Sequence, residues 1–359
     1  MRIRLQSSAI GFKKLLRSTS ITILLVGCSS ASSNSIQNKE KPSESPTAIE
    51  LAVTHTPQVN NVTFLTMSVH VEGWKGENKN PEKFDRHAKI ILDVAHEAHN
   101  AGAIFSFELS SEFAISSGAK GVVDELLSLG HAIEVHADVG GVGTPSFERL
   151  AEQLSTKFRQ IHSLGVTPIL VSGICSRGPF VEAALSAGYL MTTGVVEYCL
   201  TSLDDVYHPE GWNIDDCPSP SECHGNPGFS LSQKATPWYT TSSRSWTVPE
   251  TDADFLIVIG ESGATIKCLA EDDARSSGCE YNTKDIDKYA QLAESYVLHG
   301  EQSSEGRCCV FSTTISIGES PPEGFISDLL GSVSLLVDNG RAVWQTPQQV
   351  YERSTERKN

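Results

Sequence analysis

The chain has 359 residues, with 44 acidic and 28 basic side chains and a formal net charge of −16. Without its first 27 residues, 23 basic and 44 acidic side chains remain, for a net charge of −21. Binding to nucleic acid depends on Lys and Arg that neutralise phosphates, so no nucleic-acid partner is expected. The charge is compatible with a soluble domain in the periplasm or on a cell surface.

The N-terminal residues 1–27 are typical of a bacterial signal peptide. Basic residues precede an apolar run at 21–26, which is too short to cross a bilayer. The run ends at Leu25-Val26-Gly27-Cys28, which resembles a lipobox. We therefore expect a lipoprotein anchored through Cys28, in the outer membrane and facing the periplasm or the cell surface. An ordinary signal peptide with an incidental cysteine is the alternative. Residues 28–58 are expected to form a disordered, Ser-rich tether.

Strands and helices alternate from residue 62 onward. Strands are expected at 62–71, 104–109, 132–137, 168–172, 190–196, 255–259 and 309–317. Helices are expected at 82–100, 121–129, 146–164, 179–187, 284–299 and 324–338. This α/β pattern favours a closed or nearly closed (β/α) barrel of about seven parallel strands at 59–346, followed by a tail at 347–359. No glycine-rich phosphate loop follows a strand, so no nucleotide cofactor is expected.

An insertion at 198–254 interrupts the alternation and carries Trp212, Trp238 and Trp246. Aromatic side chains in an exported loop often stack on sugar rings, so these residues, together with Trp74, are candidates for binding a glycan. A small core that packs the insertion onto the barrel explains the three insertion tryptophans equally well.

Eight cysteines follow Cys28, and an even number in an exported protein favours disulfides. Cys217 and Cys223, and also Cys268 and Cys279, are close in sequence and are the expected pairs. Alternation along a strand would point Cys308 and Cys309 to opposite faces, so we expect each to pair elsewhere or to stay buried and reduced. A zinc knuckle is the competing interpretation, but no C-x-x-C spacing occurs.

Two expected strands end in ionisable residues. In Ser68-Val69-His70-Val71-Glu72-Gly73-Trp74, His70 and Glu72 share one face, and Glu134, His136 and Asp138 do the same at 132–138. Most other expected strands also end in acids, and the set is Glu72, Glu108, Asp138, Glu197, Glu261 and Glu319. Because parallel strands of a barrel end at one rim, this pattern predicts a cation site or a sugar-binding cleft there.

These motifs resemble those of the polysaccharide deacetylases (NodB-like, carbohydrate esterase family four). In the first motif, His70 stands at the position of the general base and Glu72 at that of a metal ligand. In the second, Leu126-Leu127-Ser128-Leu129-Gly130-His131 leads to His136 at the first metal histidine. The second metal histidine is replaced by Gly140, and Asp138 is the nearest substitute. The third motif resembles Ser176-Arg177-Gly178-Pro179, with Arg177 at the arginine.

The resemblance implies a distorted (β/α) barrel and an exported hydrolase that removes acetyl groups from a polysaccharide or peptidoglycan. It also implies a divalent metal, with zinc expected, and His70, Glu72, His136 and Asp138 as the candidate ligands. His70, Glu72, Asp138 and Arg177 are the candidate catalytic residues, and His70 is either the base or a ligand. The alternative is a glycan-binding lipoprotein that keeps the barrel but has lost the metal.

Overall fold

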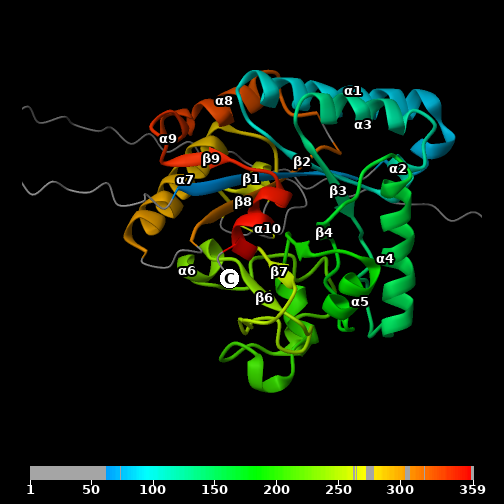
Figure 1. Cartoon of the computed structure of the whole chain (residues 1–359), viewed down its shortest axis with the longest axis vertical. Coiled ribbons are helices and arrows are strands. Elements are labelled where there is room, and N and C mark those ends of the chain that lie inside the picture. Colours follow the sequence, from blue (N-terminus) through cyan, green and yellow to red (C-terminus); the bar gives the residue numbers. More distant parts are fainter. Residues whose placement is uncertain are drawn as a thin grey trace, which may run out of the picture. The chain divides into compact units, whose positions relative to one another are not determined.

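The computed structural model describes residues 62–72, 74–261, 263, 265–271, 279–303, 308–318 and 320–356. The predicted signal peptide, the tether with Cys28, and Glu319 lie outside the described residues. Seven parallel strands form the wall of the barrel, and most of them are labelled in Figure 1. They are β1 (Thr63–Val71), β2 (Ser106–Leu109), β3 (Ala132–His136), β4 (Val171–Ser172), β5 (Met191–Thr192), β7 (Phe255–Ile257) and β8 (Val310–Ser316).

The strands form two sheets that a few backbone contacts join into a distorted barrel. The larger sheet has the order β4-β3-β2-β1-β8, and β9 (Ala342–Trp344) also pairs with β1. The smaller sheet has the order β5-β7-β6, in which β6 (Trp238–Thr240) is antiparallel. A bridge between Leu170 and Met191 joins the sheets on one side, and the Glu261 amide donates to the Ser312 carbonyl on the other. The predicted barrel of about seven parallel strands is thereby confirmed.

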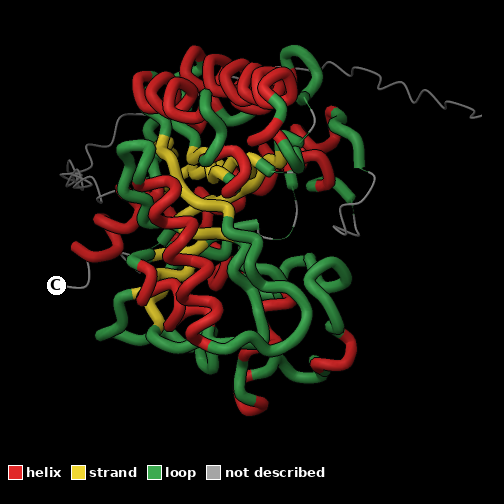
Figure 2. Tube along the Cα trace, turned by 90° about the vertical axis from the view of Figure 1, so that its right-hand side faces the viewer, coloured by secondary structure: helices red, strands yellow, loops and turns green. Residues whose placement is uncertain are grey.

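Helices cover the outside of the strands (Figure 2). The longer ones are α1 (Pro81–Asn100), α3 (Ala119–Ser128), α4 (Phe147–His162), α5 (Phe180–Ala187), α7 (Thr283–Gln302), α8 (Phe325–Gly331) and α10 (Pro347–Glu356). The short helices are α2 (Ser111–Ala114), α6 (Leu231–Ala235) and α9 (Ser334–Asp338). Within the described residues, no helix combines the length and apolar character needed to span a membrane.

Local sequence explains where α1 begins and ends. The Asn80 side chain accepts from the Lys83 amide, and Pro81 occupies the first turn, where its missing N–H costs no hydrogen bond. Gly102, just after the helix, has a φ of 73°, which a glycine adopts without strain. One face of α1 buries Ile91, Val94 and neighbouring apolar residues in the core shared with the strands.

Alternation along β1 separates the barrel interior from the helical layer. Leu65, Met67 and Val69 are buried in the main apolar core that includes the surrounding helices. The intervening side chains are polar. Thr66 and Ser68 line a small internal cavity that Pro347 and Val350 of α10 also line, and Ser68 lies 3.5 Å from Thr193 between hydroxyl oxygens. The inward-facing polar side chains of β1 therefore form a row that begins at the end of the barrel near α10 and reaches His70 and Glu72 at the opposite end.

The insertion packs around its own aromatic residues. Trp246 is fully buried, Trp238 is nearly so, and their rings stack with centroids 6.5 Å apart. Phe229 meets both rings edge-on. This arrangement matches the small-core interpretation and leaves Trp238 and Trp246 without a face for a sugar. The proposed glycan contact of these two tryptophans is therefore corrected, since a buried ring cannot stack on a ligand.

Four disulfides are present among the described residues. The predicted pairs Cys217–Cys223 and Cys268–Cys279 are confirmed. Cys175 pairs with Cys199, and Cys308 pairs with Cys309. The last pair corrects the expectation of separate partners. Cys308 and Cys309 precede β8 rather than lie within it, so strand alternation does not separate their side chains.

Two predictions for the C-terminal part are also revised. The predicted helix at 324–338 is divided into α8 and α9, because Ser332 and Val333 interrupt it. The segment expected as a tail at 347–359 contains α10, whose Val350 is buried. This helix packs at the end of the barrel remote from His70, beside Leu170 and Met191.

The Cys175–Cys199 bridge closes a longer loop than Cys217–Cys223, with sequence separations of 24 and 6. In the chain-entropy model, the longer loop contributes about 3 kcal/mol to the free energy of unfolding and the shorter one about 2 kcal/mol. We predict that replacing Cys175 and Cys199 together by Ser lowers the unfolding midpoint in urea more than replacing Cys217 and Cys223. Equal midpoints for wild type and the first variant would contradict this account.

Candidate metal centre

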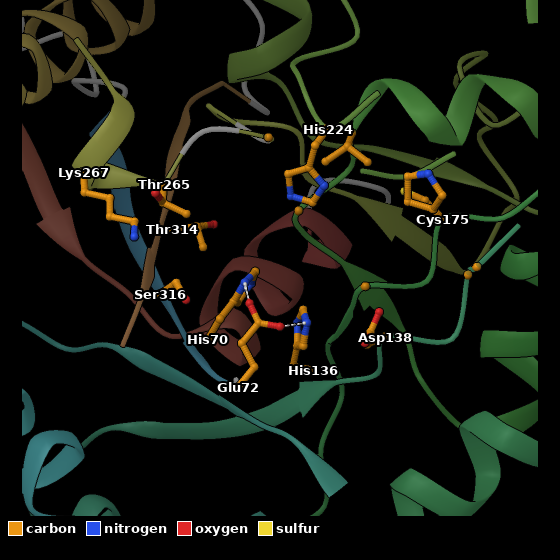
Figure 3. Close-up of a pocket in the computed structure, with 17 residues that line it drawn as sticks. His70, Glu72, His136, Asp138, Cys175, His224, Thr265, Lys267, Thr314 and Ser316 are labelled. Carbon is orange, nitrogen blue, oxygen red and sulfur yellow. Dashed lines mark ion pairs between the residues drawn. The ribbon is translucent and has the colours of Figure 1, made fainter. Parts of the chain in front are cut away.

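His70, Glu72 and His136 meet at the mouth of the barrel (Figure 3). His70 and Glu72 come from the C-terminal end of β1, and His136 is the last residue of β3. The two strands flank β2, which places the imidazole centroids 4.4 Å apart. Glu72 lies between the histidines, with Oε2 2.9 Å from His136 Nε2 and Oε1 3.8 Å from His70 Nδ1.

The three side chains fit a divalent metal. Each offers one ligand atom, and these atoms lie within 4.8 Å of one another. Two ligands of a tetrahedral zinc ion lie about 3.3 Å apart when the bonds are near 2 Å, and the measured 2.9 and 3.8 Å bracket that value. Two imidazoles and one carboxylate form a ligand set that zinc uses in hydrolases.

The charges of the cluster are strongly coupled. Although burial disfavours its anion, the hydrogen bond and charge of His136 lower the pKa of Glu72 to about 2. Burial also opposes the charged form of His70, but the neighbouring Glu108 and Glu72 carboxylates outweigh it and raise the pKa of His70. The site therefore has a negative potential that favours a cation between the imidazoles and Glu72.

Glu108 and Ser172 form a second layer beneath the two histidines. Glu108 faces His70 across the β1–β2 pairing, and its Oε2 lies 3.1 Å from His70 Nε2. The approach is not linear, so we treat it as an ion pair rather than as a well-aligned hydrogen bond. Ser172 donates a short hydrogen bond to Glu108 and lies 2.8 Å from His136 Nδ1. Glu108 was expected only as an acid at the end of a strand, with no assigned role, and Ser172 was not expected at the site.

Asp138 lies beside this cluster without joining it. Its side chain is exposed and lines the cavity, but it is not among the three groups whose ligand atoms come together. Its φ of 47° is unusual for a residue other than glycine. Two residues later, a Cβ added at Gly140 would lie 1.9 Å from the Cys175 carbonyl oxygen. This backbone therefore has no room for a histidine at position 140.

Arg177 is not brought to the cluster. Its guanidinium donates to the Cys217 carbonyl at 3.2 Å, and it does not line the cavity. In this structure Arg177 joins the loop after β4 to the disulfide loop of the insertion. Its predicted catalytic role stays a prediction, and so do the roles of the other site residues.

Two cavities meet at the cluster. The larger, of about 280 Å³, extends from His70, Glu72 and His136 to His224 and Lys267. His224 follows Cys223 in the insertion and points into this cavity (Figure 3); burial and the charge of His70 lower its pKa. His224 was not among the expected site residues, because nothing in the local pattern of the insertion indicates that it reaches the barrel mouth.

The second cavity, of about 190 Å³, shares Glu72, His136 and Asp138 with the first. Trp74 lines it, stacks on the buried His87 ring at 4.6 Å between centroids, and donates from Nε1 to the Gly318 carbonyl. Trp212 lines neither of these cavities, and its indole donates to Glu197. Of the four tryptophans proposed to bind a glycan, Trp74 is the one placed beside the cluster.

No family model matches this chain, and no curated protein matches it by sequence. Solved structures do match. One, from Mycobacterium smegmatis and described as a polysaccharide deacetylase, has a TM-score of 0.50 and 12% identity over 84% of this chain and 93% of its own. A second protein so described, from Pseudomonas aeruginosa PAO1, has a TM-score of 0.54 and 8% identity over 82% and 92%. The Puue allantoinase has a TM-score of 0.52 and 9% identity over 86% and 97%. The chain therefore has the (β/α)-barrel fold of polysaccharide deacetylases, as its motifs implied.

Proposed function

We propose that this protein is an exported, divalent-metal-dependent hydrolase that removes acetyl groups from a polysaccharide or peptidoglycan. The convergence of His70, Glu72 and His136 on an open cavity is the observation that carries the proposal. The cluster occupies the C-terminal rim of the barrel strands, where barrel enzymes place their chemistry. Two solved structures described as polysaccharide deacetylases share this fold, which supports the same reaction class.

His70, Glu72 and His136 would hold the ion in this proposal. A divalent metal in such a site supplies Lewis-acid chemistry for hydrolysis. With a pKa of about 2, Glu72 is an anion at neutral pH. A group with so low a pKa is a weak base, so Glu72 suits the role of a metal ligand better than that of a general base. Asp138 is exposed at the junction of both cavities, where it can accept a proton from a reacting group. His70 is the alternative base.

The surrounding cavities support a sugar substrate. Thr265, Thr314 and Ser316 offer hydroxyl groups on the wall of the larger cavity, and Trp74 offers an aromatic surface in the smaller one. Sugars bind through this combination of hydroxyl hydrogen bonds and ring stacking. A glycan could therefore place an acetyl group at the cluster while a neighbouring sugar occupies the second cavity.

The first test of the proposal is metal content. We predict about one zinc or other divalent ion per wild-type chain, as expected for one such site. His136→Ala should remove nearly all of it, together with acetate release from acetylated oligosaccharides. His96→Ala is a suitable control, since His96 lies on the surface of α1 and pairs with Glu125. Elemental analysis that finds no metal in the wild-type protein would leave only the glycan-binding alternative.

The role of His70 can be separated from that of His136. If His70 is a ligand, as its position in the cluster favours, His70→Ala should lower the zinc content and abolish hydrolysis together. If His70 is instead the base, the variant should retain its metal and lose hydrolysis by about 10²–10⁴-fold. Metal analysis and an acetate-release assay on one preparation distinguish the two results. Unchanged metal and activity would exclude both roles.

We also propose that the mature protein is a lipoprotein attached to the outer membrane through Cys28. The lipobox and the Ser-rich segment after it support this proposal. Cys28→Ala should prevent lipidation, so the protein should move from the membrane fraction to the soluble fraction or accumulate as an unprocessed precursor. Cell fractionation with immunoblotting measures this. Normal processing and membrane retention of the variant would contradict the anchor.

A further inference from the structure

Glu108 is an ionisable group buried inside the barrel beneath the candidate metal centre. Its side chain is fully buried, and no Lys or Arg among the described residues pairs with it. Isolation of a carboxylate from water is costly unless a charge or several hydrogen bonds compensate it. Here the compensation comes from His70, Ser172 and Thr193, whose hydroxyl lies 3.3 Å from Glu108 Oε1.

Two of these contacts lead to the candidate ligands. On one side, Glu108 Oε2 lies 3.1 Å from His70 Nε2, a buried nitrogen with no hydrogen-bond partner elsewhere in the described residues. On the other side, the same oxygen accepts from Ser172, and the Ser172 hydroxyl oxygen lies 2.8 Å from His136 Nδ1. Glu72 contacts the outer nitrogens of both rings. The contacts therefore form a closed ring of five side chains, which are Glu108, His70, Glu72, His136 and Ser172.

The direction of the hydrogen bonds follows from Glu108. An ionised carboxylate only accepts, so the Ser172 hydroxyl proton must point to it. The Ser172 oxygen is then free to accept, and His136 Nδ1 must carry the proton that it accepts. In the same way, Glu108 favours a proton on His70 Nε2. On each ring the other nitrogen, His70 Nδ1 or His136 Nε2, faces Glu72 and is the one that a bound cation would take in place of a proton.

We infer that Glu108 is a positioning residue that sets the orientation and tautomer of both His70 and His136, directly in one case and through Ser172 in the other. The inference rests on the proposed function, because it takes these two histidines as metal ligands. Carboxylates that hold the remote nitrogen of a ligating histidine strengthen metal binding, and their loss commonly costs 10–100-fold in affinity. In this protein a single carboxylate would act on two ligands.

Glu108→Gln is the main test, because it keeps the shape of the side chain and removes its charge. We expect the Kd for Zn²⁺, measured by competition with a chromophoric chelator, to rise by about 10–100-fold. Glu134→Gln is the matched control. Glu134 faces Glu108 on the neighbouring strand and is also buried, but it accepts from the Ile169 and Leu170 amides and contacts neither histidine. Its Kd for Zn²⁺ should equal that of the wild type.

Ser172→Ala removes only one oxygen atom and breaks the link between Glu108 and His136, while Glu108 stays beside His70. It should weaken zinc binding less than Glu108→Gln, and the two effects should not add in the double variant, because both act through one hydrogen-bonded chain. The visible spectrum of the Co²⁺-loaded protein should change in both variants and not in Glu134→Gln. If Glu108→Gln fails to fold, Ser172→Ala decides the outcome by the same two measurements.

The results separate this inference from the proposed function. A wild-type protein that binds no divalent metal overturns both. A wild-type protein that binds zinc, with Glu108→Gln and Ser172→Ala at wild-type affinity and with wild-type cobalt spectra, overturns the positioning role alone. Equal weakening in Glu108→Gln and Glu134→Gln would also overturn it, because the effect would then follow from replacing any buried acidic side chain in the barrel.

Discussion

Side chains alternate along β1 between a polar row inside the barrel and an apolar row under the helices. Thr66 and Ser68 face the interior, and the row ends at His70 and Glu72 where the barrel opens. A shift of the strand by one residue would bury Leu65, Met67 and Val69 in the polar interior and point His70 into the apolar core. The packing of the helices and the position of the candidate ligands therefore depend on the same register.

The polar interior creates an electrostatic constraint that apolar packing cannot relieve. Glu108 and Glu72 lie on opposite sides of His70, and their charges raise its pKa despite its burial. Without a metal, protonation of His70 would compensate for part of this negative charge. A divalent cation among His70, Glu72 and His136 would supply the same compensation and more. Metal binding would therefore also stabilise the ionised forms of Glu72 and Glu108.

The alternation of strand and helix patterns was sufficient to predict the barrel and most of its strands, and closeness in sequence predicted two of the disulfides. Period-two alternation placed His70 with Glu72, and the shared rim of parallel strands placed both near His136. Other features depend on contacts between distant segments. Ser172 meets His136 across 36 residues, and His224 reaches the cavity from a loop whose local sequence suggests only a turn. The burial of Trp238 and Trp246 likewise depends on Phe229 and on how the insertion folds upon itself.

The departures from the deacetylase motifs become consistent once the backbone at Gly140 is considered. A side chain there would collide with the Cys175 carbonyl, and the Cys175–Cys199 disulfide holds that segment to the insertion. The loop after β3 therefore cannot supply a second histidine at position 140. His70 stands instead at the end of β1, within reach of Glu72 and His136, so the cluster still contains two imidazoles and one carboxylate. The cluster therefore offers the kind of ligand set that the motifs imply, with His70 of β1 as its second imidazole.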